Sequence, residues 1–122
     1  MRKPIYECTL PFPPSVNSAY GQRSNKRRFK SKQLKEWLEK SPDLIPSKEY
    51  GMITFPVRIE YKFFFPDRRK RDVTNYIKVP EDYLVYHCVI EDDNNTIATE
   101  THAIFGGHDK GNPRVEVSIY EA

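Results

Sequence analysis

Several features that would indicate a membrane or secreted protein are missing from this chain. No apolar segment approaches the roughly 20 residues that a membrane-spanning helix needs. The first ten residues, MRKPIYECTL, lack the apolar core of a signal peptide. Internal repeats and low-complexity tracts are also absent. We therefore expect a cytoplasmic protein, and 122 residues fit a single domain over 1–122.

Cysteine and histidine are scarce. The two cysteines, Cys8 and Cys88, have no CxxC spacing, and we expect a buried pair of free thiols rather than a disulfide. The three histidines are scattered and are expected to be structural or surface residues: His87, His102 and His108. No His/Cys cluster therefore indicates zinc.

Charge is distributed unevenly along the chain. The net charge is only +3, but RSNKRRFKSK and RRKR hold most of the positive charge. Many carboxylates lie in the later segment between Glu81 and Glu100. A basic surface close to an acidic cluster indicates a polyanionic partner and a separate role for the acids. Ordinary solvated surface is the alternative explanation.

Hydrophobic patterning predicts an α+β fold, with one mixed β-sheet packed against two main helices. Residues 54–65 alternate apolar and polar side chains, as a half-buried strand does, and Pro56 places an edge or a bulge at its start. Ser31 is a candidate cap for a helix to about Lys40, with Leu34, Trp37 and Leu38 on its apolar face. The other predicted elements are strands 5–10, 97–105 and 115–120, a second helix from Thr74, and loops over 11–21 and 40–51.

The second helix places charged residues on one face. If Thr74 is the origin, a rotation of about 100° per residue places Lys78, Glu81 and Asp82 on one exposed side. Helix-surface ion pairs would explain this spacing without any further function. However, Asp72 precedes the helix, and Asp92 and Asp93 follow a short apolar run, so these carboxylates can converge at a sheet edge. Several hard oxygen ligands at one point suit Mg²⁺ or Mn²⁺.

The order of these basic and acidic residues is similar to a known family motif. The stretch RRKRDVTNYIKVPEDYLVYHCVIEDD resembles the core motif of the RusA-type Holliday junction resolvases, which are small homodimeric endonucleases often carried by phages and prophages. That motif has a basic run, Asp-x-Asp-Asn, a lysine, a helical aspartate, and Asp-Asp after an apolar stretch. The opening LPFPPSVNSAY matches the family's Pro-Pro-Ser-x-Asn sequence. The resemblance covers nearly the whole chain and implies a RusA-like fold.

The resemblance implies site residues position by position. Catalytic roles fall on Asp72, Lys78 and Asp93, with Asp92 beside the last as a further metal ligand. Asn75 and Asp82 match family positions without a defined role. DNA contacts fall on the basic run Arg68, Arg69, Lys70 and Arg71. The implied cofactor is Mg²⁺, or Mn²⁺. The implied partner is a four-way DNA junction, which a homodimer would nick in pairs during recombination or repair.

Two positions depart from the family pattern. Thr74 stands where a second catalytic aspartate is expected, and Pro80 should kink the helix or force a late start. We hypothesise that Glu81, about two helical turns along the same face, supplies the missing carboxylate as a metal ligand. The competing hypothesis is a branched-DNA-binding protein whose metal site has degenerated. A metal-independent, toxin-like ribonuclease is a third class, but it leaves Asp72 and Asp93 unexplained.

A second basic segment is expected in the loop NKRRFKSK. Its cations are candidate DNA contacts: Lys26, Arg27, Arg28 and Lys30. Phe29 lies among them and would stack on or wedge between bases, as aromatic residues do in single-strand binding sites. A flexible basic loop with one packed phenylalanine is the equal alternative.

Overall fold

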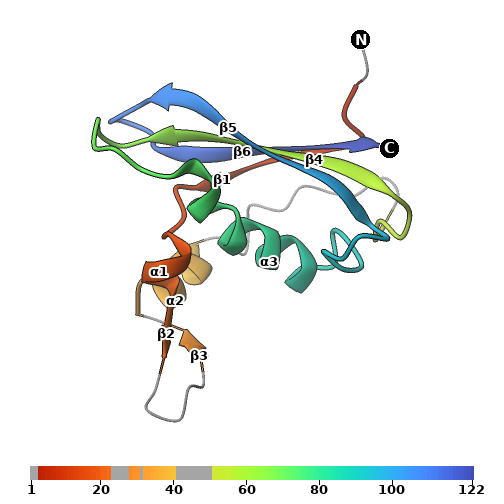
Figure 1. The fold of residues 1–122 in the computed structure, drawn as a ribbon, viewed down its shortest axis with the longest axis horizontal. Coiled ribbons are helices and arrows are strands. Elements are labelled where there is room, and N and C mark those ends of the chain that lie inside the picture. The colour runs from red at the N-terminus through yellow and green to blue at the C-terminus, as the bar shows by residue number, and fades with distance from the viewer. Residues whose placement is uncertain (1–2, 23–27, 31, 41–50) are drawn as a thin grey trace.

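A computed structural model describes residues 3–22, 28–30, 32–40 and 51–122. Four strands form one mixed sheet in the order β1-β6-β4-β5, and helix α3 runs beneath one face of that sheet (Figure 1). The predicted α+β fold is thereby confirmed. The strands of this sheet are β1 (Tyr6–Pro11), β4 (Val57–Phe65), β5 (Ala98–His108) and β6 (Arg114–Glu121).

Strand β4 is the centre of the sheet. It pairs with β6 in the antiparallel sense and with β5 in the parallel sense. The predicted alternation is confirmed, since its odd-numbered side chains are buried from Val57 to Phe65. The strand begins at Val57 rather than Thr54, and the β4–β5 register shifts directly after Val57. The irregularity predicted beside Pro56 is therefore present.

Parallel pairing of β4 with β5 requires a crossover between them. The 3₁₀ helix η2 (Val73–Tyr76) and helix α3 (Lys78–Tyr86) supply this crossover. Val79, Pro80, Tyr83 and Leu84 form the buried side of α3. Strand β6 then returns on the other side of β4, so β5 and β6 are consecutive in the chain but are not neighbours in the sheet.

The prediction of one continuous helix from Thr74 is wrong. Thr74 belongs to η2, and Ile77 separates η2 from α3. Pro80 is the third residue of α3, where a backbone N–H has no intrahelical acceptor, so the helix starts late and loses no hydrogen bond. The late start expected from Pro80 is confirmed. The angular positions calculated from Thr74 therefore do not apply to the residues of α3.

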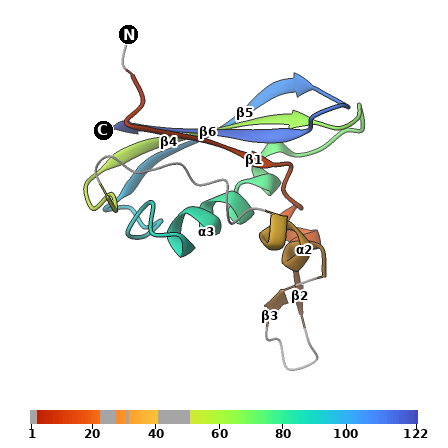
Figure 2. The ribbon, with the colours of Figure 1, turned by 180° about the vertical axis from the view of Figure 1, so that it is seen from behind.

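The remaining elements lie on the same side of the sheet as α3, and β2 and β3 extend away from the sheet (Figure 2). Helix α2 (Lys32–Lys40) is confirmed, and its Leu34 and Trp37 are buried. The Pro-rich segment is a loop only as far as Ser15, because α1 (Val16–Ala19) and the hairpin of β2 (Tyr20–Gln22) with β3 (Arg28–Lys30) follow it. Ser31 and the predicted loop at 41–50 lie outside the described residues.

The cysteine prediction is half correct. Cys8 is buried in β1, and neither cysteine forms a disulfide. Cys88 is exposed rather than buried, because it occupies the turn after α3 with a φ of 57°. His102 and His108 are exposed, and His87 is partly buried. Within the described ranges, no helix is long and apolar enough to cross a membrane.

Candidate metal centre and nucleic-acid interface

Three carboxylates converge beside helix α3. One oxygen each from Glu81, Asp82 and Asp93 lies within 4.8 Å of the others, and all three side chains are partly buried. We call these three residues the acidic cluster. The Lys78 Nζ atom lies 2.9 Å from Asp82 Oδ1 and 3.7 Å from Asp93 Oδ2. The ammonium group therefore bridges the helix and the loop that follows it.

Local sequence explains why the cluster forms. Lys78, Glu81 and Asp82 are separated by three and four residues, so they share one face of α3. Val89 and Ile90 are fully buried, and Ile90 forms a parallel bridge with Ile53. This apolar run anchors the chain against the core just before Asp93. Of the three aspartates expected to converge, Asp93 is the one that the structure places beside Glu81 and Asp82 of α3.

The cluster holds its acids in different protonation states. Burial, a hydrogen bond with Asp93 and the charge of Asp93 raise the pKa of Glu81 from its usual 4.5 to about 7. Burial also acts to raise the pKa of Asp93, but hydrogen bonds from Glu81 and Asp92 and the charge of Lys78 outweigh it, so that pKa is lowered. A protonated Glu81 therefore donates to an ionised Asp93 near neutral pH.

Lysine 78 is held as a cation. A hydrogen bond to Asp82 is the main reason that the pKa of Lys78 is raised, with Asp93 and Glu81 adding their charges. Its side chain is still 43% exposed. The ammonium group is thus fixed by two carboxylates and remains open to a molecule arriving from solvent.

Other predicted site residues lie outside the acidic cluster. Asp72 is exposed and makes no side-chain capping bond to η2. Thr74 is also exposed. Asn75 donates its backbone N–H to the Asp72 carbonyl at 3.0 Å. Asp92 Oδ1 accepts the Asp93 N–H at 2.7 Å, and Oδ2 accepts Asn94 Nδ2 at 3.1 Å. The catalytic role of Asp72 and metal binding by Asp72 and Asp92 stay predictions.

Glu81 does not share a helix face with Thr74, contrary to the sequence-based hypothesis. Thr74 lies in η2 and Glu81 in α3, and the break at Ile77 separates the two helices. Glu81 reaches the cluster instead because it shares the α3 face with Lys78 and contacts Asp93 across the loop.

The basic run divides into two parts. Arg68, Arg69 and Lys70 are exposed, whereas the Arg71 side chain is only 10% exposed. Two hydrogen-bonding ion pairs join Arg71 to Asp67, at 2.7 Å and 3.0 Å. The guanidinium carbon of Arg71 also lies 5.4 Å from the centroid of the Phe65 ring. Arg71 therefore secures the loop, a role that the sequence pattern did not indicate.

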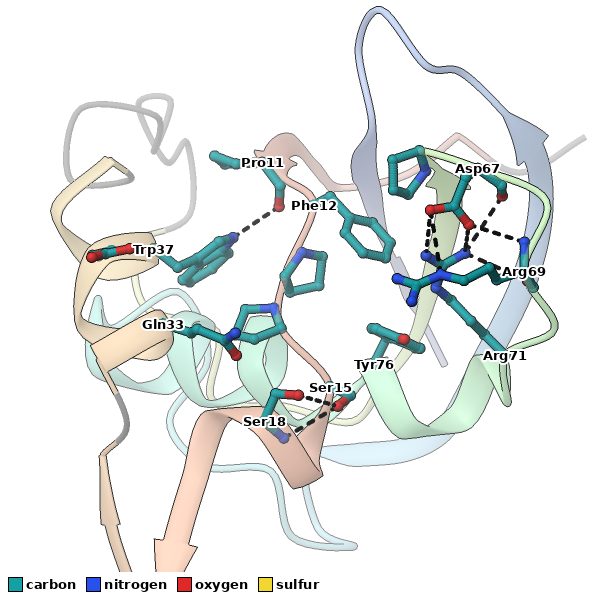
Figure 3. Close-up of a pocket in the computed structure, with 14 residues that line it drawn as sticks. Pro11, Phe12, Ser15, Ser18, Gln33, Trp37, Asp67, Arg69, Arg71 and Tyr76 are labelled. Carbon is teal, nitrogen blue, oxygen red and sulfur yellow. Dashed lines mark hydrogen bonds and ion pairs between the residues drawn. The ribbon is translucent and has the colours of Figure 1, made fainter.

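A groove opens beside this basic run (Figure 3). Its volume is about 400 Å³, and it lies between the Pro-rich loop, α2 and residues 66–76. Aromatic and proline rings line it together with two guanidinium groups: Phe12, Pro13, Pro14, Tyr76, Arg69 and Arg71. The Nε1 atom of Trp37 donates to the Pro11 carbonyl at 2.9 Å and ties α2 to the loop. The Pro-Pro-Ser sequence is the one feature of the sequence that points to this groove, because Pro13, Pro14 and Ser15 all line it.

The second basic segment is described only in part. Lys26 and Arg27 lie outside the described residues, and so does the core of their loop. Arg28 and Lys30 belong to β3, but their side chains, like that of Phe29, are not described. Their predicted DNA contacts stay predictions.

Comparison with known proteins gives one finding. The family model of endodeoxyribonuclease RusA matches residues 11–120, which include the Pro-rich loop, the basic run and every residue of the acidic cluster. A search of curated proteins found no match.

Proposed function

Because the chain belongs to the RusA endodeoxyribonuclease family, we propose that it is a divalent-metal-dependent nuclease that acts in the cytoplasm. Its substrate would be a four-way DNA junction, resolved by paired hydrolysis of phosphodiester bonds in recombination or repair. The observation that carries this proposal is the convergence of three carboxylates within 4.8 Å.

The residues of the acidic cluster fit a hard divalent cation such as Mg²⁺ or Mn²⁺. They offer only carboxylate oxygens, which are the ligands that these ions prefer. Asp93 and Glu81 would hold the ion, with Asp82 beside them. When bound, the ion would lower the pKa of a coordinated water and offset charge on the phosphoryl group. Glu81 would supply the carboxylate that is missing at position 74, where the family pattern has an aspartate and this chain has Thr74. Asp72 remains a candidate catalytic residue.

Lys78 would act on the phosphate directly. Its ammonium group is oriented by Asp82 and Asp93, so its position does not depend on the substrate. A fixed cation beside the reacting phosphate stabilises negative charge that develops in the transition state. Its exposed fraction of 43% leaves room for a phosphate oxygen to approach.

The exposed cations of the basic run would bind the DNA backbone. Arg68, Arg69 and Lys70 lie at the rim of the aromatic groove or next to it. Such phosphate contacts make binding fall steeply with salt and carry no sequence information. The neighbouring rings of Phe12 and Tyr76 offer flat surfaces to bases that have unstacked at the branch point.

A homodimer would match the symmetry of the junction. Two equal subunits related by a two-fold axis can nick opposing strands in equivalent positions. Strand β5 is an 11-residue edge of the sheet, and its Phe105 is 55% exposed. An exposed strand edge with an apolar side chain is a surface on which a second copy can pair.

The alternative function is binding of branched DNA without cleavage. Thr74 favours this alternative, because a family position that should carry a catalytic carboxylate has a neutral, exposed side chain. The two functions differ in whether metal ions support cleavage.

Nicking of a labelled four-way junction separates these possibilities. The junction and a linear duplex control are incubated with the protein in Mg²⁺, in Mn²⁺ and in chelator. We expect symmetric, metal-dependent nicks in the junction alone, lost in Asp93→Asn and retained in Glu91→Gln, which changes an exposed glutamate outside the acidic cluster. Tight junction binding with no nicks in either metal would establish the binding protein instead. Nicks that persist in chelator would contradict both.

A further inference from the structure

One polar group in the core has no evident structural use. Tyr61 lies in the middle of β4 and is fully buried. Its hydroxyl has no hydrogen-bond partner among the described residues. Burying a hydroxyl without a partner costs stability, and most buried polar groups in proteins are paired. A phenylalanine, as at the neighbouring buried position Phe63, would fill the same strand position without this cost.

The charged groups near the Tyr61 hydroxyl indicate its role. Burial is the largest cause that raises the pKa of Tyr61, and the charges of Glu81, Asp93 and Asp82 add to it. The phenol therefore lies within electrostatic reach of every member of the acidic cluster. Helix α3, which carries Glu81 and Asp82, runs beneath the sheet (Figure 1), and the Tyr61 side chain lies on the buried face of β4.

Carboxylates that bind metal ions need support from a second set of residues. A carboxylate that gives one oxygen to an ion usually accepts a hydrogen bond on the other, and this bond fixes its orientation. The Glu81 carboxyl hydrogen-bonds to Asp93, and the Tyr61 hydroxyl has no partner among the described residues. A metal ion that engages Glu81 and Asp93 would replace that contact and leave a Glu81 oxygen in need of a donor.

We propose that Tyr61 is a positioning residue for the metal site, and that its hydroxyl donates a hydrogen bond to Glu81 when Glu81 binds a divalent ion. The inference rests on the proposed function, since it requires a metal ion at the acidic cluster. It gives a use to a buried hydroxyl that has no partner among the described residues and lies within electrostatic reach of Glu81. The ring of Tyr61 packs in the core, and its hydroxyl forms a hydrogen bond only when the metal ion is bound.

Calorimetric binding of Mg²⁺ and Mn²⁺ to the full chain tests this proposal. We expect Tyr61→Phe to bind the ion about tenfold more weakly than the native chain, within the 10–100-fold effect of such supporting residues. In chelator the same variant should melt at the native temperature or higher, because an unpaired buried hydroxyl has been removed. A merely structural tyrosine would lower the melting temperature and leave metal affinity unchanged.

Tyr6→Phe is the matched control. Tyr6 is also a buried tyrosine, but its pKa is raised by burial, Cys8 and Tyr83 and by none of the cluster acids. Tyr6→Phe should bind metal ions with native affinity. Native metal affinity in Tyr61→Phe, or a lower melting temperature in chelator, would overturn the proposal. If the native chain binds neither ion, the proposed function fails first, and this inference fails with it.

Discussion

The acidic cluster makes the stability of the metal-free protein depend on pH through Glu81. Glu81→Gln removes the charge but keeps the size of the side chain and its ability to donate to Asp93. One pKa unit corresponds to about 1.4 kcal/mol. The rise from 4.5 to about 7 therefore limits the contribution of Glu81 to about 3.4 kcal/mol. Glu81 is partly exposed, so solvent screening reduces this limit to about 1–2 kcal/mol.

The sign follows from the direction of the pKa change. A carboxyl whose pKa is raised on folding stabilises the fold below the unfolded value of 4.5, and this contribution is lost as pH rises through about 7. Glutamine stays neutral and loses nothing. The unfolding free energy of Glu81→Gln relative to the native chain should therefore increase by about 1–2 kcal/mol between pH 5 and pH 8.

Urea unfolding in chelator at both pH values measures this difference. Glu91→Gln is the control, because Glu91 is an exposed glutamate outside the acidic cluster. Its unfolding free energy should follow that of the native chain at both pH values. If Glu81→Gln also follows the native chain, Glu81 is not held protonated by Asp93, and the electrostatic description of the site is wrong.

Three further outcomes are expected at the proposed DNA and dimer surfaces. Lys70→Ala should leave the melting temperature unchanged and lower the salt dependence of junction binding by about one phosphate contact, measured by titration at several salt concentrations. Arg71→Ala should instead destabilise the fold by about 1–2 kcal/mol in urea unfolding, because it breaks the charged hydrogen bonds with Asp67. Phe105→Glu should convert a dimer into a monomer in analytical ultracentrifugation; a dimer that persists would place the interface elsewhere.

The central strand could be predicted because its signal is local and strong. From Val57 to Phe63 the apolar and polar positions alternate, Phe64 is the one apolar residue at an outward position, and burial follows the alternation as far as Phe65. The β2–β3 hairpin was missed because strands of three residues are too short to show a period. The break at Ile77 was missed because an apolar residue interrupts the helix without any change in composition. Pro80 was the one indication that the helix begins late.

In the site, too, contacts within one helix could be predicted from the sequence, and contacts between different elements could not. Lys78 and Asp82 could be placed together because their separation of four residues determines their contact on a helix. The role of Arg71 could not be predicted, because the aromatic ring over which it packs belongs to a different element. Tyr61 looked like an ordinary core residue, since its place in the alternation does not reveal whether its hydroxyl has a partner.

The position of β4 also governs when the site can assemble during synthesis. The strand that carries Tyr61 is held on one side by β6, and β6 in turn pairs with β1, where Tyr6 lies opposite Ile119. Contacts between residues so distant in sequence form late in folding. A ribosome-bound chain that has not yet released β6 has no complete sheet against which α3 can pack. We therefore expect the proposed metal site to stay incomplete until translation of the domain is nearly finished, which would keep an unfinished chain from cleaving DNA.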